Sequence, residues 1–267
     1  EHQSITSAQN SKIKLANKLR NKRHREREGL FVVDDGRDLS RALVCGYEME
    51  FCFYCADYAS EDDLALLITL ENINIMIYDV PADLMDKAAY RQNPGGFVAV
   101  MRQKPRLTIQ DIPKAEGHIF GLVDLRKPGN IGALLRTADA AGIEQIFLID
   151  ISLDLYNPNI IRSSTGANFL GNIYHMHSTE ARAYCQKNDI HLVAAHLDGT
   201  ISLYDYDFTA QRSLMLLGKE DTGLDDTWVN HADVLLKIPM VGQLSDSLNV
   251  SVSGAVMMYE ALRQQHP

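Results

Sequence analysis

The spacing of apolar and polar positions alternates along the chain between the period of a strand and the period of a helix. In the first hundred residues, β-branched and aromatic runs lie at 30–33, 48–55, 73–79 and 96–101. Segments with helical spacing lie near 12–28, 37–45, 61–70 and 81–90. This order predicts a small α/β domain over residues 1–101.

A second alternation begins after residues 102–116, which lose periodicity, contain two prolines and are expected to form a linker. The predicted strands of the second half are 119–124, 146–150, 173–176, 191–196, 213–217 and 234–238. The predicted helices lie near 130–141, 179–188, 223–230 and 248–264. Six strands with helices between them predict a largely parallel sheet that is covered on both faces, over residues 117–267.

Charge is distributed unevenly over the 267 residues, whose formal net charge is −9. Residues 12–27 carry eight basic residues and one acid, whereas residues 117–267 carry 10 basic and 17 acidic residues. The basic segment indicates a nucleic-acid partner, with a merely solvated helix face as the alternative. The predicted nucleic-acid contacts are its basic side chains: Lys12, Lys14, Lys18, Arg20, Lys22, Arg23, Arg25 and Arg27.

Several classes of protein are excluded by what the sequence lacks. No apolar run reaches the ~18 residues that span a bilayer, so no membrane partner is expected. Four cysteines are too few for a disulfide framework, which favours a reducing, cytoplasmic location. The GxGxxG, GxxxxGK[ST] and GxSxG motifs are absent, which argues against the dinucleotide fold, the P-loop and the common hydrolase elbow.

Two short patterns resemble metal sites but are better explained structurally. Cys52 and Cys55 form a lone CxxC in a β-rich run, where alternation directs the two thiols to opposite faces. No second pair completes a zinc site, so we expect buried structural cysteines. His175 and His177 share a strand face without a nearby carboxylate, and we interpret them as edge or surface histidines. No metal is expected.

Three polar and glycine-containing clusters each follow a predicted strand, at residues 127–137, 216–224 and 238–252. Taken singly, Asn130 could cap a helix, Gly218 and Gly223 could serve turns, and Ser247 could begin the last helix. Arg136 could be a surface residue, although an arginine within an apolar helix usually contacts a specific partner. Since ligands of open α/β sheets bind beyond the carboxyl ends of strands, the three clusters together indicate one ligand site.

The three clusters contain NxGAxxRT (Asn130–Thr137), LGxExxGL (Leu217–Leu224) and IPM…SLNVSV (Ile238–Val252). In this order they resemble the three motifs of the SpoU (TrmH-like) RNA 2′-O-ribose methyltransferases of the SPOUT superfamily. The resemblance covers residues 117–264. The N-terminal half is similar to the small L30e-like RNA-binding domain often fused ahead of this catalytic domain, with Val33-Asp-Asp-Gly36 where such domains commonly show Val-Glu-Gly.

The resemblance implies a SPOUT-type parallel sheet with a deep trefoil knot at residues 117–267, preceded by the L30e-like RNA substrate-binding domain at 1–101. It also implies a homodimer that uses S-adenosylmethionine. Carried over by motif position, the cofactor-binding residues are Gly218, Ile238, Met240 and Leu248, with Ala195 and His196 expected in the same pocket. The catalytic residues are Arg136, Asn130, Glu220, Ser247 and Asn249.

The resemblance also suggests roles for these residues. Because a guanidinium resists deprotonation, we expect Arg136 to clamp a phosphate or the 2′-oxygen while a phosphate oxygen or water accepts the proton. Asn130 is expected to orient the guanidinium, and Glu220 to fix the arginine or the ribose. Large-subunit (23S) ribosomal RNA is the expected substrate. The alternatives are transfer-RNA methylation and a catalytically silent RNA-binding or ribosome-assembly dimer.

Three positions depart from the family pattern. Lys127 stands where many members have Asp, and Lys219 stands where a small or polar residue is more usual. The stretch from Ile238 to Ser247 is one residue longer than is common. None of these departures removes a motif residue, so activity is expected.

Overall fold

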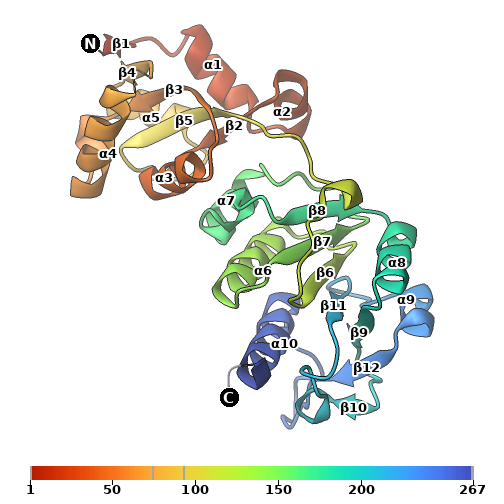
Figure 1. The fold of residues 1–267 in the computed structure, drawn as a ribbon. Coiled ribbons are helices and arrows are strands. Elements are labelled where there is room, and N and C mark those ends of the chain that lie inside the picture. Colours follow the sequence, from red (N-terminus) through yellow and green to blue (C-terminus); the bar gives the residue numbers. More distant parts are fainter. Residues whose placement is uncertain (1, 74, 93, 266–267) are drawn as a thin grey trace. The chain divides into compact units, whose positions relative to one another are not determined.

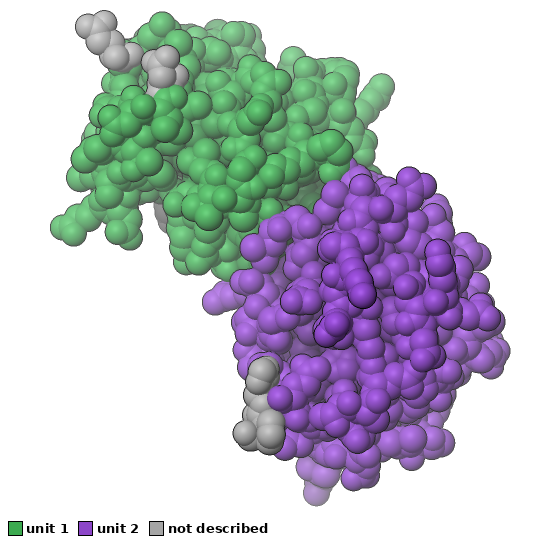
Figure 2. Space-filling model, viewed as in Figure 1, with its two compact units in different colours: residues 1–105, 154–169 green, residues 106–153, 170–267 purple. Residues whose placement is uncertain are grey.

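The computed structural model describes residues 2–73, 75–92 and 94–265. The chain divides into two compact units, which are coloured separately in Figure 2. Unit 1 contains Glu1–Pro105 and Asp154–Phe169, and unit 2 contains Arg106–Leu153 and Leu170–Pro267. A segment from the middle of the chain therefore completes the N-terminal unit. The domain boundaries expected from the sequence, at residues 101 and 117, stay a prediction.

Unit 1 is built on a mixed five-stranded sheet with the order β1-β4-β3-β5-β2 (Figure 1). The strands are β1 (Gln3–Ser4), β2 (Leu30–Val33), β3 (Met49–Tyr54), β4 (Ile77–Asp79) and β5 (Phe97–Arg102). β4 pairs in parallel with β1 and β3, whereas β5 runs antiparallel to β3 and β2. The four predicted strands are all present. β1 was not predicted, because two residues carry no periodic pattern.

Helices cover both faces of this sheet. They are α1 (Ser11–Lys18), α2 (Lys22–Glu28), α3 (Gly36–Val44), α4 (Glu61–Asn72), α5 (Ala82–Ala88) and α7 (Pro158–Ser164), with 3-10 turns η1 (Ala56–Tyr58) and η3 (Ala167–Phe169). α1 and α5 pack over Phe53 on one face, while α3 and α4 pack over Phe31 on the other. Cys52 lies in the second cluster and Cys55 in the first, which confirms the expected opposite orientation of the two thiols. Burial raises the pKa of the Cys52 thiol to about 12.

The single basic helix expected over residues 12–28 is wrong, because the chain turns between α1 and α2. The Asn21 side chain accepts a hydrogen bond from the N–H of Arg23 and so begins α2 with an N-cap. The buried guanidinium of Arg25 donates to the carbonyl oxygens of Leu19 and Arg20 at this corner. The prediction of Arg25 as an RNA contact is also wrong, because its guanidinium is buried and hydrogen-bonded inside unit 1.

Residues 154–169 are fastened to unit 1 by an ion pair and by aromatic packing. The Asp154 carboxylate accepts hydrogen bonds from Nε and Nη2 of Arg25 at 3.2 and 2.9 Å. Their side chains are 9% and 2% exposed, respectively. Tyr156 stacks on Phe31 with the ring centroids 4.4 Å apart, and Ile161 belongs to the same buried cluster as Phe31. These contacts are the reason that the segment belongs to unit 1.

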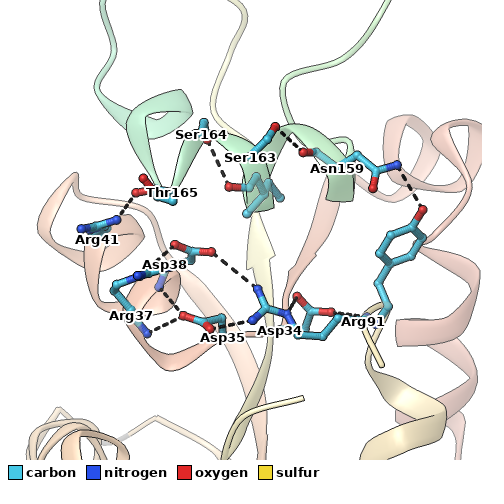
Figure 3. A network of polar contacts seen from close by, with 12 residues as sticks. Asp34, Asp35, Arg37, Asp38, Arg41, Arg91, Asn159, Ser163, Ser164 and Thr165 are labelled. Atoms are coloured by element: carbon cyan, nitrogen blue, oxygen red, sulfur yellow. Dashed lines mark hydrogen bonds and ion pairs between the residues drawn. The ribbon is translucent and has the colours of Figure 1, made fainter. Parts of the chain in front are cut away.

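A polar network connects α3 with α7 and its C-terminal turn (Figure 3). The Arg91 guanidinium pairs with the Asp35 carboxylate at 2.7 Å. Asp38 is 1% exposed, and burial, reinforced by the neighbouring Asp35 carboxylate, raises its pKa to about 6. One turn further along α3, Arg41 donates a hydrogen bond to the carbonyl oxygen of Thr165, whose φ of +50° ends α7.

Unit 2 is built on a seven-stranded sheet with the order β10-β12-β9-β11-β6-β7-β8, and every pair is parallel. The strands are β6 (Ile119–Val123), β7 (Gln145–Ile149), β8 (Ile173–Met176), β9 (His191–Ala195), β10 (Ile201–Ser202), β11 (Ser213–Leu217) and β12 (Val234–Lys237). The six predicted strands and the parallel sheet are confirmed, and two-residue β10 is the addition. β8 is an edge strand, which confirms the interpretation of His175 as an edge histidine. The trefoil knot implied by the family stays a prediction.

Two pairs of helices cover the two faces of this sheet (Figure 1). The helices are α6 (Pro128–Ala140), α8 (Ser178–Lys187), α9 (Asp226–His231) and α10 (Val250–Gln265), with 3-10 turns η2 (Ile109–Asp111) and η4 (Leu203–Asp205). α6 packs against α10, and a Cβ on Gly254 of α10 would lie 2.3 Å from Leu134 of α6. Cys185 of α8 and Trp228 of α9 are buried together on the opposite face. Among the described residues, no helix is both long and apolar enough to cross a membrane.

Candidate active site

Three neighbouring strands of unit 2, β12, β9 and β11, end at a cavity of about 410 Å³. The wall of the cavity includes all six residues assigned to the cofactor by motif position: Ala195, His196, Gly218, Ile238, Met240 and Leu248. Glu220 and Ser247 from the expected catalytic set line the same cavity. The fold therefore brings the second and third motifs together, while the role of each residue stays a prediction.

The turn after β11 is closed so tightly that it requires glycine. Lys219 and Gly223 exchange two backbone hydrogen bonds of 3.0 Å each, and Gly223 has a φ of +69°. A Cβ on Gly218 would lie 2.2 Å from the carbonyl carbon of Gly223, so a side chain at position 218 does not fit. The turn presents the side chains of Lys219 and Glu220 from a fixed backbone.

Glu220 binds the beginning of α6, which carries the first motif. Its Oε1 accepts hydrogen bonds from the backbone N–H of Lys127 and from Nδ2 of Asn130, both at 3.1 Å. Burial alone raises the pKa of Glu220, but the hydrogen bonds from Asn130, Lys127 and Arg126 outweigh burial and lower the pKa below its ordinary value. The carboxylate is therefore ionised at neutral pH, and it lies where the positive end of the α6 dipole stabilises it.

Asn249 connects the third motif to this arrangement. Its Nδ2 lies 3.5 Å from Oδ1 of Asn130, and its own Oδ1 accepts a 2.9 Å hydrogen bond from the N–H of Ser251 at the start of α10. One chain of polar contacts thus runs from Glu220 through Asn130 to Asn249. Three of the five expected catalytic residues are brought together, one from each motif.

Arg136 is not part of that chain. Its side chain is exposed, and no hydrogen bond or ion pair to another described residue involves its guanidinium. The helical geometry explains this separation: six residues along α6 correspond to about 240° of rotation from Asn130, so the two side chains leave different faces. The expected contact between Asn130 and Arg136 is absent from the described residues of this single chain, and so is a contact between Glu220 and Arg136.

Two further charged residues at this edge had no role in the sequence analysis. Nζ of Lys219 lies 2.9 Å from Oδ2 of Asp124, which directly follows β6. Asp124 has a φ of +50° and also lies 3.6 Å from the Arg126 guanidinium. The sequence offered two signals: Asp124 ends a predicted strand and Lys219 lies just beyond another, and Lys219 departs from the family pattern.

In unit 1, the basic segment at residues 12–27, called the arm below, has fewer unpaired basic side chains than its charge suggested. Lys12 lies over the rings of Phe51 and Tyr78, Arg20 donates to the carbonyl oxygens of Lys87 and Ala89, and Lys22 and Arg27 pair with Glu26 and Glu28. Among the described residues, the exposed basic side chains of this segment that form no hydrogen bond, ion pair or ring contact are those of Lys14, Lys18 and Arg23. These three remain available for a polyanion.

The cavity has the chemistry that S-adenosylmethionine requires. Ile238, Met240 and Leu248 provide apolar side chains for an adenine ring, and the bare backbone at Gly218 allows close approach. Acidic side chains, including Glu220 and Asp198, suit a cationic sulfonium and an amino group. The residues present fit this cofactor.

Comparison with known proteins agrees with this site. A model described as the SpoU rRNA Methylase family matches residues 117–259, which is more than half of the chain. The chain belongs to this family. A second model, the MRM3-like substrate binding domain, matches residues 10–99 of the SpoU protein.

Relatives span nearly the whole length of this SpoU protein. It is 32% identical to a 23S rRNA (uridine(2479)-2′-O)-methyltransferase from Streptomyces viridochromogenes, over 92% of this chain and 87% of that one. A crystal structure of an RNA 2′-O ribose methyltransferase matches with 32% identity and a TM-score of 0.88, covering 98% of this chain and 99% of that chain. An AdoMet-bound rRNA methyltransferase from Sinorhizobium meliloti matches with 25% identity and a TM-score of 0.85, covering 99% of both. The expected family, enzyme class and cofactor are confirmed.

Proposed function

We propose that this SpoU protein methylates the ribose 2′-hydroxyl of a nucleotide in 23S ribosomal RNA, acting in the cytoplasm as a homodimer. The observation that carries the proposal is the joining of all three motifs: residues of the second and third line one cavity, and Glu220, Asn130 and Asn249 connect them to the first. The 23S relative, which matches over 92% of this chain and 87% of its own length, supports the choice of substrate.

The cofactor is held by the residues at the ends of β9, β11 and β12. The backbone at Gly218 and the apolar side chains of Ile238, Met240 and Leu248 would hold the nucleoside, with Ala195 and His196 on the same wall of the cavity. When bound, S-adenosylmethionine supplies a methyl group on a positively charged sulfur. Because the 2′-oxygen must approach opposite that sulfur, orientation by Ser247 and Asn249 contributes much of the rate.

Arg136 clamps the RNA in this proposal. An exposed guanidinium that has no partner among the described residues of its own chain is available for the substrate phosphate or the 2′-oxygen. Its charge stabilises the negative charge that develops on the oxygen, while a phosphate oxygen or water accepts the proton, since arginine does not act as a base. Glu220, ionised and bound to the start of α6, keeps that helix in position.

A second copy of the chain is the partner that suits the outer face of α10. Val252 and Tyr259 are seven residues apart on this helix, so they share a face, and they are 46% and 48% exposed. A symmetric contact through this apolar face buries both residues in each copy. Sedimentation at micromolar concentration tests this part of the proposal: we expect a dimer from the wild type and a monomer from Tyr259→Glu.

Transfer of labelled methyl groups to purified RNA tests the activity. The wild type is expected to label 23S ribosomal RNA but not transfer RNA. The phosphodiester bond that follows the labelled ribose is expected to resist alkaline cleavage, because its 2′-oxygen is methylated. Label in transfer RNA alone would replace the substrate with the alternative class. Absence of label in both, together with absence of S-adenosylmethionine binding at millimolar concentration, would favour the silent RNA-binding dimer.

Arg136 variants separate the clamp from the cofactor site. Arg136→Lys retains the charge but loses the planar fork, and we expect its rate constant to fall by about 10²-fold. Arg136→Ala should bind S-adenosylmethionine with nearly wild-type affinity in calorimetry, because the side chain does not line the cavity. A wild-type rate for Arg136→Lys would refute the clamp, and a large loss of cofactor affinity would place Arg136 in the cofactor pocket.

A further inference from the structure

The ion pair between Asp124 and Lys219 joins two turns that belong to different motifs. Asp124 occupies the turn between β6 and α6, and Lys219 occupies the turn between β11 and α9. Oδ2 of Asp124 and Nζ of Lys219 are 2.9 Å apart, and the two side chains are 33% and 31% exposed. A pair that is two-thirds buried and this short has a defined geometry, unlike a freely solvated surface pair.

The two turns are also joined by the next residue along the chain. Glu220 accepts hydrogen bonds from the backbone N–H groups of Lys127 and Arg126, three and two residues after Asp124. Lys219 and Glu220 are therefore consecutive residues of the turn after β11 that both bind the turn after β6. Lys219 binds it through its ammonium group and Glu220 through its carboxylate. The backbone of Lys219 is fixed by its two hydrogen bonds to Gly223, so the Lys219 and Glu220 side chains leave one closed turn and together hold it against the turn after β6.

Asp124 holds its carboxylate from an uncommon backbone conformation. Its φ of +50° lies in the left-handed region, which is sparsely populated by residues other than glycine but is tolerated by Asp and Asn. Strained positions of this kind concentrate at functional sites. The turn directs the carboxylate at Lys219 and, more distantly, at the Arg126 guanidinium at 3.6 Å.

We infer that Asp124 and Lys219 are positioning residues for methyl transfer. Their ion pair holds Glu220 against the start of α6, and this contact fixes the position of the first motif relative to the second around the acceptor ribose. The inference rests on the proposed function. It assigns Lys219 a partner within the protein, whereas a lysine beside an RNA site could instead bind a phosphate. The two roles predict different kinetics.

Variants at both ends of the pair separate these roles. Asp124→Asn preserves the left-handed backbone and removes the charge, and Lys219→Met preserves the length of the side chain. If the pair positions Glu220, each variant lowers kcat at least about tenfold, because small displacements in an active site are costly. The KM for RNA stays within about twofold in both variants, and the Kd for S-adenosylmethionine stays within about twofold in Asp124→Asn, because Asp124, unlike Lys219, does not line the cavity. The double variant is no slower than the slower single variant.

The matched control is Lys187→Met, which removes an exposed cation near the end of α8, outside the cavity, and is expected to retain wild-type kinetics. Thermal midpoints of all variants should stay within about 4 °C of the wild type, since a partly exposed pair contributes little to stability. The inference is overturned if kcat is unchanged in both single variants. It is also overturned if Lys219→Met alone raises the KM for RNA and flattens its salt dependence while Asp124→Asn has no effect, because that result identifies a phosphate contact.

Hydrogen exchange of the free protein tests the inference independently of methylation. Loss of the pair should accelerate exchange of the Arg126 and Lys127 amides, which donate to Glu220. A wild type without activity on any RNA would refute the proposed function, whereas unchanged exchange in both variants would refute the positioning role. The two failures are therefore distinguishable.

Discussion

Replacement of Asp154 by alanine is expected to destabilise unit 1 severely. Asp154 is the only ion-pair partner of Arg25 among the described residues. The pair forms hydrogen bonds of 2.9 and 3.2 Å, and the side chains of Asp154 and Arg25 are 9% and 2% exposed. Removing one member leaves a buried guanidinium whose remaining partners are the carbonyl oxygens of Leu19 and Arg20. Loss of one partner from a buried pair costs about 3–5 kcal/mol.

The assay can distinguish the two units because the chain has a single tryptophan, Trp228, which is buried in unit 2. We expect Asp154→Ala to lower the urea midpoint followed through hydrogen exchange of β2, β3 and β5, while the tryptophan fluorescence transition moves less. The matched control is Glu28→Ala, which removes the partner of exposed Arg27 and should cost at most about 1 kcal/mol.

A double variant completes the test. Arg25→Met with Asp154→Leu removes both charges and retains volume, so it should recover much of the stability lost by the single change. A loss below about 1 kcal/mol for Asp154→Ala would show that Arg25 is not confined by this carboxylate. The docking of residues 154–169 on unit 1 would then need another explanation.

Three other predictions follow from separate features. Gly254→Ala should destabilise unit 2 by about 1–3 kcal/mol in urea unfolding followed by Trp228 fluorescence, because the new Cβ lies 2.3 Å from Leu134 and 2.9 Å from Leu217; Gly129→Ala, with open space around it, is the control. Asp38, whose burial raises its pKa from 3.8 to about 6, stabilises the fold below pH 4, and this contribution is lost as the pH rises to about 6. Asp38→Asn should therefore flatten the stability profile between pH 4 and 6, and an unchanged slope there would contradict the assignment. Lys14→Glu with Lys18→Glu should weaken RNA binding without changing cofactor affinity, and should reduce the slope of the logarithm of RNA affinity against the logarithm of salt concentration by about 2. Unchanged RNA affinity would show that these lysines belong to a solvated helix face and do not bind RNA.

The elements that the sequence predicted well are those whose burial is periodic. β3 illustrates this: alternation alone separated Cys52 from Cys55, and the structure buries them in different clusters. The parallel sheet of unit 2 was predicted from a second signal, because strands buried on both faces produce continuous apolar runs such as Ile119–Val123. Two-residue strands such as β10 were missed because they are too short for any period.

The sequence predicted which residues belong to the candidate site, but it did not predict which of them contact one another. The resemblance to the SpoU motifs assigned Glu220, Asn130 and Asn249 to the site, and the structure connects their side chains. It did not reveal that Glu220 binds backbone N–H groups of the neighbouring turn, nor that Asp124 meets Lys219. Such contacts join residues some 90 positions apart and depend on which strands become neighbours, which local patterns do not encode.

The sequence by itself determined the alternation of strands and helices, the location of three motifs at strand ends, and the concentration of positive charge in residues 12–27. Tertiary structure decided what that charge is used for. Arg25 is buried against Asp154, 129 residues away, whereas Lys14, Lys18 and Arg23 stay exposed. The physical reason is that composition fixes the number of charges, but desolvation and pairing, which arise only when distant segments pack, decide which charges can still meet RNA.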